Sequence, residues 1–231
     1  MESFFYAENT PKIQLDTKTL TVDFLPIKEV ATGAVFGYEA FLQTQGMTYE
    51  EIEASYGAAN KLGELDENTF LFGINTFLHE NREGYLILNS YPNVNMTVAT
   101  ANKIASMGGK EIAGRLIVSM SDYADLNPLA WDMKRRSLIT TEAAPQYMMG
   151  GFGRSKKNDI AAMKMMKPKV VRLAKEFTDG VHANAKKQAV VKDIVRTLHG
   201  REILVLASGI ATKEDEDFLV SAGIDLTQLC E

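Results

Sequence analysis

The sequence predicts a modified TIM-type (β/α)8 barrel, in which parallel strands are surrounded by helices and one strand runs antiparallel. Three observations support this fold class. Short apolar segments alternate with amphipathic helical segments, which is typical of parallel strands buried on both faces. About seven or eight such units follow one another, which favours a closed barrel over an open sheet. The length of 231 residues is also ordinary for a single barrel domain.

The antiparallel strand is expected at the start of the barrel. Residues 20–27 alternate in residue type and suit a strand, and residues 35–42 suit a second one. Thr32-Gly33 lies between them and predicts a turn, so the two strands should form a hairpin. Residues 1–18 are then an N-terminal extension, and residues 19–231 form the barrel of a single domain.

The first helix is marked by a start signal. Thr48 is followed three residues later by Glu51, which is the spacing of a capping box. The helix is expected to run to about Leu62 and to stop at Gly63, because glycine commonly ends helices. A second helix is predicted over residues 65–78.

The rest of the chain alternates more regularly. The segment 125–145 is the least periodic, but Asn127-Pro128 predicts a helix start, and Trp131 and Met133 are expected to pack inward. Thr212 is expected to cap a helix that ends at Gly223. The remaining expected strands are 85–88, 116–118, 146–149, 170–173, 203–206 and 225–227, and the remaining helices are 98–107 and 185–198.

Composition narrows the function classes. The net charge of −5 and the pI of about 5.4 disfavour non-specific nucleic-acid binding, which needs a basic field. Cys230 is the single cysteine, so no intrachain disulfide is expected, which fits a reducing compartment. The first residues lack the pattern of a signal peptide, and no apolar run is long enough to cross a bilayer. We therefore expect a cytoplasmic domain with no membrane partner.

The C-terminal ends of barrel strands are where active sites lie in this fold class. A hydrolase that uses two divalent cations needs several convergent carboxylates there. Glu39 is the one carboxylate at the predicted strand ends. Asp122 or Asp225 would add to it only by pointing inward, and neither is at the expected place, so no metal site is expected. His79, His182 and His199 have no cysteine or acid at ligand spacing and are expected at the surface. The strand-end residues are, in order, Glu39, Asn89, Ser119, Gly150, Gly151, Arg172, Ser208 and Gln228.

Several short motifs at these strand ends resemble those of the EAL family of cyclic di-GMP phosphodiesterases. Residues 37–42, Gly-Tyr-Glu-Ala-Phe-Leu, are similar to the family's Tyr-Glu-Ala-Leu-Leu signature, so Glu39 matches a metal-binding glutamate. Residues 89–92, Asn-Ser-Tyr-Pro, are similar to the family's Asn-x-x-Pro, so Asn89 matches a metal-binding asparagine. Gln228 matches the glutamine near the end of the fold. These three are the retained positions.

Other functional positions of the family are replaced. Gln43 stands where the family has an arginine that contacts the ligand phosphate. The aspartate pair that precedes Phe-Gly in the family is Gly150-Gly151 here. The remaining replacements are Ser119 for a metal glutamate, Arg172 for the catalytic lysine, Ala174 for an aspartate, and Ser208 for a glutamate. Residues that serve the backbone, such as Phe152, Gly153, Pro168 and Gly209, remain.

The resemblance, together with the replaced residues, implies a function that differs from that of the family. The family hydrolyses cyclic di-GMP to linear pGpG with Mg²⁺ or Mn²⁺. With most ligands lost, we expect an inactive regulatory protein that acts by protein–protein interaction in bacterial signalling, with little or no cyclic di-GMP binding and without a cofactor. A homodimer through the helix after the glycines is possible from the resemblance. The alternatives are a non-hydrolysing cyclic di-GMP receptor, and an active phosphodiesterase with an altered site that would need Mg²⁺ or Mn²⁺.

Some residues have two interpretations. Glu39 is either a metal ligand or a rim carboxylate that pairs with Arg172 or a backbone donor, because an unpaired buried charge is costly. Arg172 can contact a phosphate, but its guanidinium stays protonated and cannot act as a base. Residues 154–159 are interpreted as a basic loop, either solvated or able to attract an anion or an acidic protein surface. The residues considered for ligand or partner binding are Gln43, Arg154, Lys156, Lys157 and Arg172. The methionines at 163–166 are expected in the core or at an interface.

Overall fold

The structure is a computed structural model that describes residues 4–7, 10–15, 18–43, 47–120, 126–154 and 156–229. Side chains are described from residue 21 onward within these ranges, except at residues 156–158. Cys230 and the side chains of Lys156 and Lys157 therefore lie outside the described parts.

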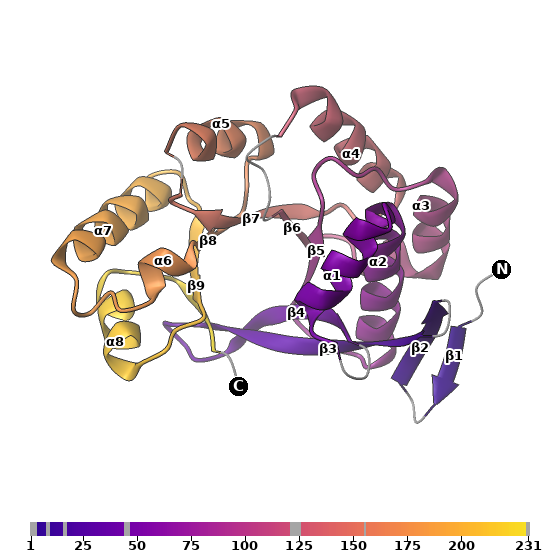
Figure 1. Cartoon of the computed structure of the whole chain (residues 1–231), viewed down its shortest axis with the longest axis horizontal. Coiled ribbons are helices and arrows are strands. Elements are labelled where there is room, and N and C mark those ends of the chain that lie inside the picture. Colours follow the sequence, from indigo (N-terminus) through magenta and orange to yellow (C-terminus); the bar gives the residue numbers. More distant parts are fainter. Residues whose placement is uncertain are drawn as a thin grey trace. The chain divides into compact units, whose positions relative to one another are not determined.

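The strands form the predicted closed barrel with one antiparallel member (Figure 1). The hydrogen-bonded order is β3-β10-β9-β8-β7-β6-β5-β4, and an additional β3–β4 pairing closes it. β3 runs antiparallel to β10, whereas β10, β9, β8 and β7 pair in parallel. The barrel strands are β3 (Lys18–Glu29), β4 (Val35–Gln43), β5 (Tyr85–Ser90), β6 (Leu116–Met120), β7 (Gln146–Phe152), β8 (Val170–Leu173), β9 (Leu204–Ser208) and β10 (Leu226–Gln228).

The predicted hairpin at the start of the barrel is confirmed. The Glu29 amide donates to the Ala34 carbonyl at 2.9 Å, and Gly33 occupies the turn with a φ of +70°. A positive φ is inexpensive for glycine because it has no Cβ. Before the hairpin, β1 (Phe4–Ala7) and β2 (Thr10–Leu15) pair antiparallel, and β2 then pairs with the first residues of β3.

The chain divides into two compact units. The first unit comprises residues 1–25, 38–118 and 127–145, and the second comprises residues 26–37, 119–126 and 146–231. Each unit has its own helices. Those of the first unit are α1 (Tyr49–Ala58), α2 (Leu62–His79), α3 (Val98–Ile104), a π-helical turn at Ala105–Gly109, and α4 (Pro128–Thr140). Those of the second are α5 (Lys156–Met166), α6 (Lys175–Thr178), α7 (Ala185–His199) and α8 (Lys213–Ser221).

The start of α1 is confirmed, but its predicted end is wrong. Thr48 accepts a hydrogen bond from the Glu51 amide, and the Glu51 carboxylate accepts one from the Thr48 amide, which completes the capping box. The helix ends at Ala58, and Asn60 has a φ of +56°. Gly63 lies in the first turn of α2 instead of ending α1, because asparagine tolerates the left-handed conformation that turns the chain here.

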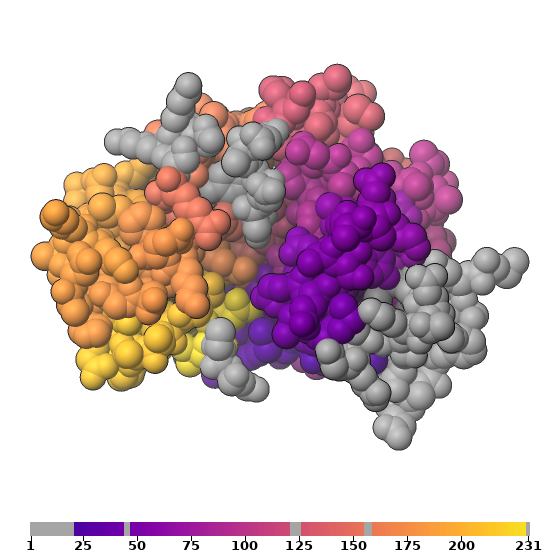
Figure 2. Space-filling view, in the orientation of Figure 1, coloured from indigo at the N-terminus to yellow at the C-terminus, as the bar shows by residue number. Residues whose placement is uncertain are grey.

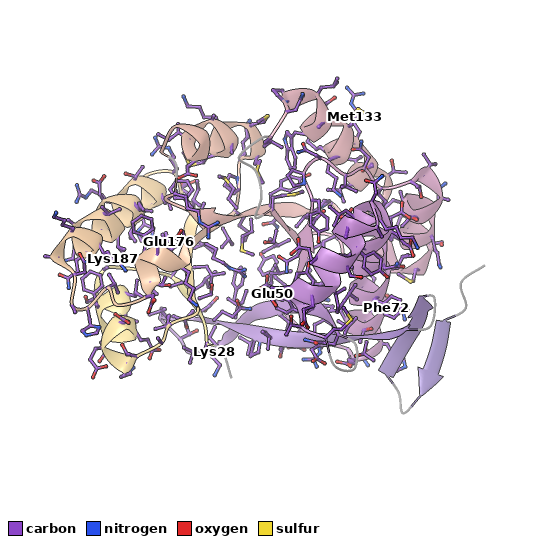
Figure 3. All side chains as sticks on the ribbon, viewed as in Figure 1. Lys28, Glu50, Phe72, Met133, Glu176 and Lys187 are labelled. Carbon is purple, nitrogen blue, oxygen red and sulfur yellow. The ribbon has the colours of Figure 1, made fainter. Side chains whose placement is uncertain are left out.

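The core of the first unit packs α2 closely on β5. Phe70, Phe72 and Phe77 of α2 are fully buried, and Figure 3 labels Phe72. A Cβ added at Gly73 would lie 2.4 Å from Leu88 Cδ2 of β5, so glycine permits this close approach. The helix and strand thus bury one continuous apolar surface.

α4 begins at the predicted residue, but the Met133 side chain does not pack inward as expected. Asn127 caps the helix by accepting hydrogen bonds from the amides of Leu129 and Ala130. Trp131 is buried as expected, whereas Met133 is 49% exposed and lies on the outer side of α4 (Figure 3). Two residues correspond to about 200° around a helix, so both side chains cannot face the same core.

The second unit alternates strands and helices as predicted, with one correction. Residues 156–159 are the first turn of α5 and not a loop, so the predicted basic loop is wrong over these positions. Met163 and Met166 are buried within the chain, at 5% and 2% exposure, so these two belong to the core as expected. Thr212 caps α8 as expected, by accepting a hydrogen bond from the Asp215 amide.

No helix in the described part of the chain is both long enough and apolar enough to span a membrane.

Candidate functional site

Two retained side chains meet at the strand ends of the first unit. Glu39 lies on β4 and is fully buried, and Asn89 lies near the end of β5. The Asn89 side-chain amide donates to Glu39 Oε1 at 3.0 Å. This hydrogen bond gives the buried carboxylate a polar partner, which a buried charge requires. Sequence analysis did not anticipate this pair, and the proposed pairing of Glu39 with Arg172 stays a prediction.

A buried ion pair supports the end of β5. Lys134 of α4 and Asp66 of α2 are both fully buried, and Lys134 Nζ lies 2.5 Å from Asp66 Oδ2. The other oxygen, Asp66 Oδ1, accepts a hydrogen bond from Ser90 Oγ at 2.6 Å and one from the Tyr91 amide at 3.3 Å. Since Ser90 and Tyr91 directly follow Asn89, this network holds the backbone that carries the retained asparagine.

In the second unit the strand end of β7 is a glycine turn. Gly151 and Gly153 have φ values of +68° and +109°, a region that favours glycine. The Gly153 amide donates to Asp159 Oδ2 at 2.9 Å, which ties the turn to the first turn of α5. A Cβ added at Gly153 would lie 2.5 Å from Phe177 Cε2. Conformation and space therefore both require glycine at 153.

A guanidinium faces the vacated position at Gly151. A Cβ built on Gly151 would lie 3.3 Å from Arg154 Nη1, and Arg154 Nε lies 3.1 Å from Glu176 Oε1 on α6. The pKa of Glu176, labelled in Figure 3, is lowered by a hydrogen bond from its own backbone amide and further by the Arg154 guanidinium. The space next to Gly151 is thus occupied by a guanidinium, and the carboxylate nearest to it is already paired with that guanidinium, which is unfavourable for a metal cation.

The strand ends of β8 and β10 are joined by a hydrogen bond. Arg172 donates from Nη2 to Gln228 Oε1 at 3.3 Å, and Gln228 is buried. At the end of β9, the carbonyl of Ser208 accepts a hydrogen bond from Thr178 Oγ1 at 3.2 Å. These groups are a permanent cation, an amide and a hydroxyl, so they offer anion or hydrogen-bond contacts but no general base.

The other predicted site residues lie on the barrel strands, but no described contact joins them to one another. Ser119 is fully buried on β6, and its hydroxyl has no hydrogen-bond partner among the described residues. Gln43 is half-buried at the end of β4. Of the predicted binding cations, Arg154 and Arg172 have the partners given above. Sequence reasoning missed Lys134, Asp66 and Glu176, because their partners lie far along the chain.

The donor groups of each unit do not fit a pair of divalent cations. Such a pair needs several carboxylates, and among the described residues the strand ends offer Glu39 in the first unit and none in the second. Within the described ranges, no three His, Cys, Asp or Glu side chains are grouped so that they could hold a metal ion. No chemical step through Mg²⁺ or Mn²⁺ is therefore derived for this chain.

A barrel of eight strands with an antiparallel first strand, carrying Glu39 and Asn89 at its strand ends, is consistent with the predicted resemblance to EAL domains. Comparison with known families agrees, since residues 146–228 match the EAL domain model. The predicted resemblance to EAL-type proteins is thereby confirmed for this part of the chain. The matched range begins at β7 and ends at β10, so it lies within the second unit.

Solved structures extend the likeness to the whole fold. BlrP1 of Klebsiella pneumoniae, solved as a manganese and cyclic di-GMP complex, superposes with a TM-score of 0.77 at 19% identity, covering 99% of this chain and 57% of that one. The EAL domain of Xanthomonas citri FimX, solved with cyclic di-GMP, has a TM-score of 0.71 at 15% identity, covering 90% of this chain and 85% of that one. At these identities the likeness shows the fold alone.

A curated relative shares a shorter stretch of sequence. The blue light- and temperature-regulated antirepressor BluF of Escherichia coli is 32% identical over 69 residues, which is 30% of this chain and 17% of BluF. The chain thus spans a small part of this relative and about half of BlrP1.

Proposed function

We propose that this chain is a regulatory EAL-like protein that acts by binding another protein and does not hydrolyse cyclic di-GMP. The observation that carries the proposal is the electrostatics of the second unit's strand ends. Gly150, Gly151 and Ser208 provide no carboxylate, and the space beside Gly151 is occupied by the Arg154 guanidinium. A cation placed there would meet the guanidinium, and the nearby Glu176 carboxylate is already paired with Arg154, whereas a two-metal phosphodiesterase needs several free carboxylates.

The described strand ends of the second unit also lack the catalytic base of the family. Arg172 stands where the resemblance places the catalytic lysine, and a guanidinium remains protonated at any physiological pH. Its hydrogen bond to Gln228 fixes it as a structural or anion-contacting group. What remains is an intact backbone without the groups that activate water, which is expected when a fold is kept for binding. The name of the relative BluF, an antirepressor, is consistent with a role in regulation.

Calorimetric titration with cyclic di-GMP, with and without Mg²⁺ or Mn²⁺, tests this proposal together with a chromatographic assay for pGpG. An active EAL-domain phosphodiesterase serves as the positive control. We expect no pGpG above the buffer blank and no saturable binding at micromolar nucleotide. Formation of pGpG that disappears with EDTA would overturn the proposal.

A metal-independent micromolar affinity without turnover would replace the proposal by a receptor function. Arg172→Ala is the variant that identifies such binding, because Arg172 is the strand-end cation able to contact a phosphate. Lys110→Ala is the matched control, since Lys110 is an exposed cation of the first unit whose side chain is 84% exposed. A receptor that uses the strand ends would lose affinity in the first variant and not in the second.

A further inference from the structure

A pocket lies between α2 and α3 in the first unit. Its volume of about 470 Å³ is within the range of small-molecule sites. The two helices pack against one another, and α3 is drawn in magenta in the space-filling view of Figure 2. One wall is a single face of α2, because its lining residues recur about once per turn, and the other wall is formed by residues of α3 and of the segment just before it. The α2 wall consists of Gly63, Glu64, Glu67, Asn68 and Leu71.

Glu67 joins the two walls of the pocket. Its Oε1 accepts a hydrogen bond from the Thr97 amide at 2.6 Å, and its Oε2 accepts one from Thr100 Oγ1 at 2.7 Å. Thr97 in turn caps α3, because its side chain accepts a hydrogen bond from the Thr100 amide at 3.2 Å. A pocket whose walls are joined in this way is formed before a ligand arrives, which lowers the entropy cost of binding.

Asn68 brings a buried donor without a partner to this pocket. The residue lines the pocket and is 2% exposed, and its Nδ2 has no hydrogen-bond partner among the residues that the structure describes. Buried amides are ordinarily paired, because an unmet donor costs free energy. An occupant that presents a hydrogen-bond acceptor to Asn68 would remove this cost.

The charges of the lining favour a positively charged occupant. Among the described residues, the lining contains two carboxylates, from Glu64 and Glu67, and one ammonium group, from Lys103. The Thr97 amide and the Thr100 hydroxyl carry no charge, so their hydrogen bonds leave the Glu67 carboxylate negative, and each of its oxygens can accept a further hydrogen bond. Glu64 lies 3.6 Å from Lys61 in an exposed pair, which contributes little.

We propose that the α2–α3 pocket binds a small primary amine that carries an oxygen atom on a neighbouring carbon, as in an amino sugar or an amino alcohol. The ammonium group binds the Glu67 carboxylate, and the neighbouring oxygen accepts a hydrogen bond from Asn68 Nδ2. The charge-assisted hydrogen bond supplies affinity, and the amide fixes the orientation of the ligand. The lining lies on α2, on α3 and just before α3, so the proposal does not depend on whether the strand ends bind or hydrolyse nucleotide.

Glucosamine is the probe, because it carries an ammonium group next to hydroxyl oxygens. In the matched control ligands, N-acetylglucosamine and glucose, the charge is removed by acetylation or by replacement of the amine with a hydroxyl. The three sugars are titrated into the full chain at about pH 6.5, where the amine is protonated, and followed by ¹H–¹⁵N spectra. We expect saturable shifts with glucosamine at Gly63, Thr100 and the Asn68 side-chain amide, and a Kd on the order of 1 mM, as for a ligand of this size. The control sugars should bind at least about tenfold more weakly.

Asn68→Leu tests the buried donor. Leucine is branched at the same carbon as asparagine and has no polar group, so we expect glucosamine to bind at least about fivefold more weakly without a fall in the melting temperature. Circular dichroism measures the melting temperature of each variant and checks that it is folded. Ala99→Phe is a second variant, because Ala99 is exposed and lines the pocket, so that the larger side chain blocks the ligand and leaves the core unchanged.

Glu67→Gln tests the charge. Glutamine still offers an oxygen to the Thr97 amide but carries no charge, so glucosamine should bind at least about tenfold more weakly. Glu50→Gln is the matched control, because Glu50, labelled in Figure 3, is an exposed acid of the first unit that lies outside the lining. This control should bind glucosamine like the wild type.

Four outcomes overturn the proposal. Equal binding of glucosamine and glucose removes the charge argument. Shift changes outside residues 63–71 and 95–103, or equal losses in Glu67→Gln and Glu50→Gln, place the contact elsewhere. A lower melting temperature of Asn68→Leu with unchanged glucosamine affinity gives Asn68 a structural role. No saturable shift with glucosamine at concentrations on the order of 20 mM leaves the Asn68 amide to a bound water. Because none of these readouts involves cyclic di-GMP, failure here is distinguishable from failure of the proposed function.

Discussion

The two units of the molecule retain different parts of the EAL pattern. The first unit keeps Glu39 and Asn89, which match functional residues of the family, yet it lies outside the range that matches the family model. The second unit has glycine, serine and arginine at its strand ends, yet residues 146–228 match that model. Similarity to the family is therefore greatest where the carboxylates are missing.

This difference indicates that the second unit resembles the family in the residues that determine its backbone. Gly153 combines a φ of +109° with a Cβ position that Phe177 occupies, so the fold itself demands glycine. Gly209 and Gly223 also have positive φ values, of +63° and +92°. Such residues are kept because the turns between strands and helices need them, whatever the chemistry at the strand ends.

The first unit instead contains a network of buried polar contacts next to the end of β5. Asp66 and Lys134 form a fully buried ion pair that also holds Ser90 and the Tyr91 amide beside Asn89. A buried pair is expensive to desolvate and is stable only when its hydrogen bonds are complete. The network thus preserves the geometry of one strand end, whereas the second unit preserves the geometry of its turns.

The largest expected effect tests the buried network of the first unit. Lys134→Met removes one partner and leaves the Asp66 carboxylate buried without its cation. We expect the free energy of unfolding to fall by about 3–5 kcal/mol, measured by urea denaturation. Asp66→Asn combined with Lys134→Met should recover part of the loss, because no charge is then left buried.

Lys110→Met is the control for the lysine substitution, because the Lys110 side chain is 84% exposed. Its effect should stay within about 0.5 kcal/mol. If Lys134→Met and Lys110→Met were equally mild, the buried pair would not be what holds the first unit, and the contrast between the two units would fail.

A smaller effect is expected from the turn of the second unit. Gly153→Ala places a methyl group 2.5 Å from Phe177 Cε2 and forces alanine to a positive φ, so we expect a loss of about 2–4 kcal/mol. Gly209→Ala is the matched variant, because Gly209 has a φ of +63° and open space around its Cβ position. It should lose only the strain, about 1–2 kcal/mol. Equal losses in urea denaturation would show that Phe177 yields easily.

Much of the fold was predictable because it depends on local patterns. The alternation of apolar strands with helices, the hairpin at Thr32-Gly33 and the capping box at Thr48 are all written within short stretches of sequence. The misplaced end of α1 and the helical start of α5 were not predictable, because Gly63 and the basic run 154–157 fit more than one local structure. At α5, the hydrogen bond from the Gly153 amide to the Asp159 carboxylate stabilises the helical start.

The candidate site was predictable in its positions and not in its contacts. The strand-end residues follow from the strand order, but the hydrogen bond between Asn89 and Glu39 joins residues 50 apart. Lys134 was missed because a lysine is ordinarily a surface residue and its partner Asp66 is 68 positions away. A buried charged residue can be recognised from the sequence only when its charged partner is also known.

Asp215 gives a pH-dependent test of the second unit. Burial raises the pKa of Asp215, but hydrogen bonds from the His182 amide and ring, from Thr212 and from the Gly180 amide outweigh this and lower the pKa to about 2. Because the pKa is depressed in the folded state, the stabilisation is complete above the ordinary value of 3.8 and is lost as pH falls through about 2.

We therefore expect Asp215→Asn to lower the free energy of unfolding by about 1–3 kcal/mol at neutral pH. The difference from the wild type should shrink between pH 3.8 and about 2, measured by guanidinium denaturation across this range. Asp217→Asn is the control, because the Asp217 side chain is 66% exposed. A difference that stayed constant down to pH 2 would mean that the carboxylate charge does not hold the loop before α7.

The smallest expected change in stability comes from restoring a carboxylate at the vacated turn. Gly151→Asp places an acid at a φ of +68°, which aspartate tolerates better than most residues, and directs it toward Arg154 Nη1. The strain and a new exposed ion pair are each worth about 1 kcal/mol and oppose one another, so the free energy of unfolding should change by less than about 1 kcal/mol. Calorimetry should detect no Mn²⁺ binding, because the new carboxylate and Glu176 would both pair with the Arg154 guanidinium. Gly151→Asp combined with Arg154→Ala should not bind Mn²⁺ either, since the new carboxylate and Glu176 are still too few ligands. Micromolar Mn²⁺ affinity in the single variant would show that the second unit lacks one ligand and not several, and would bring its strand ends much closer to those of an enzyme.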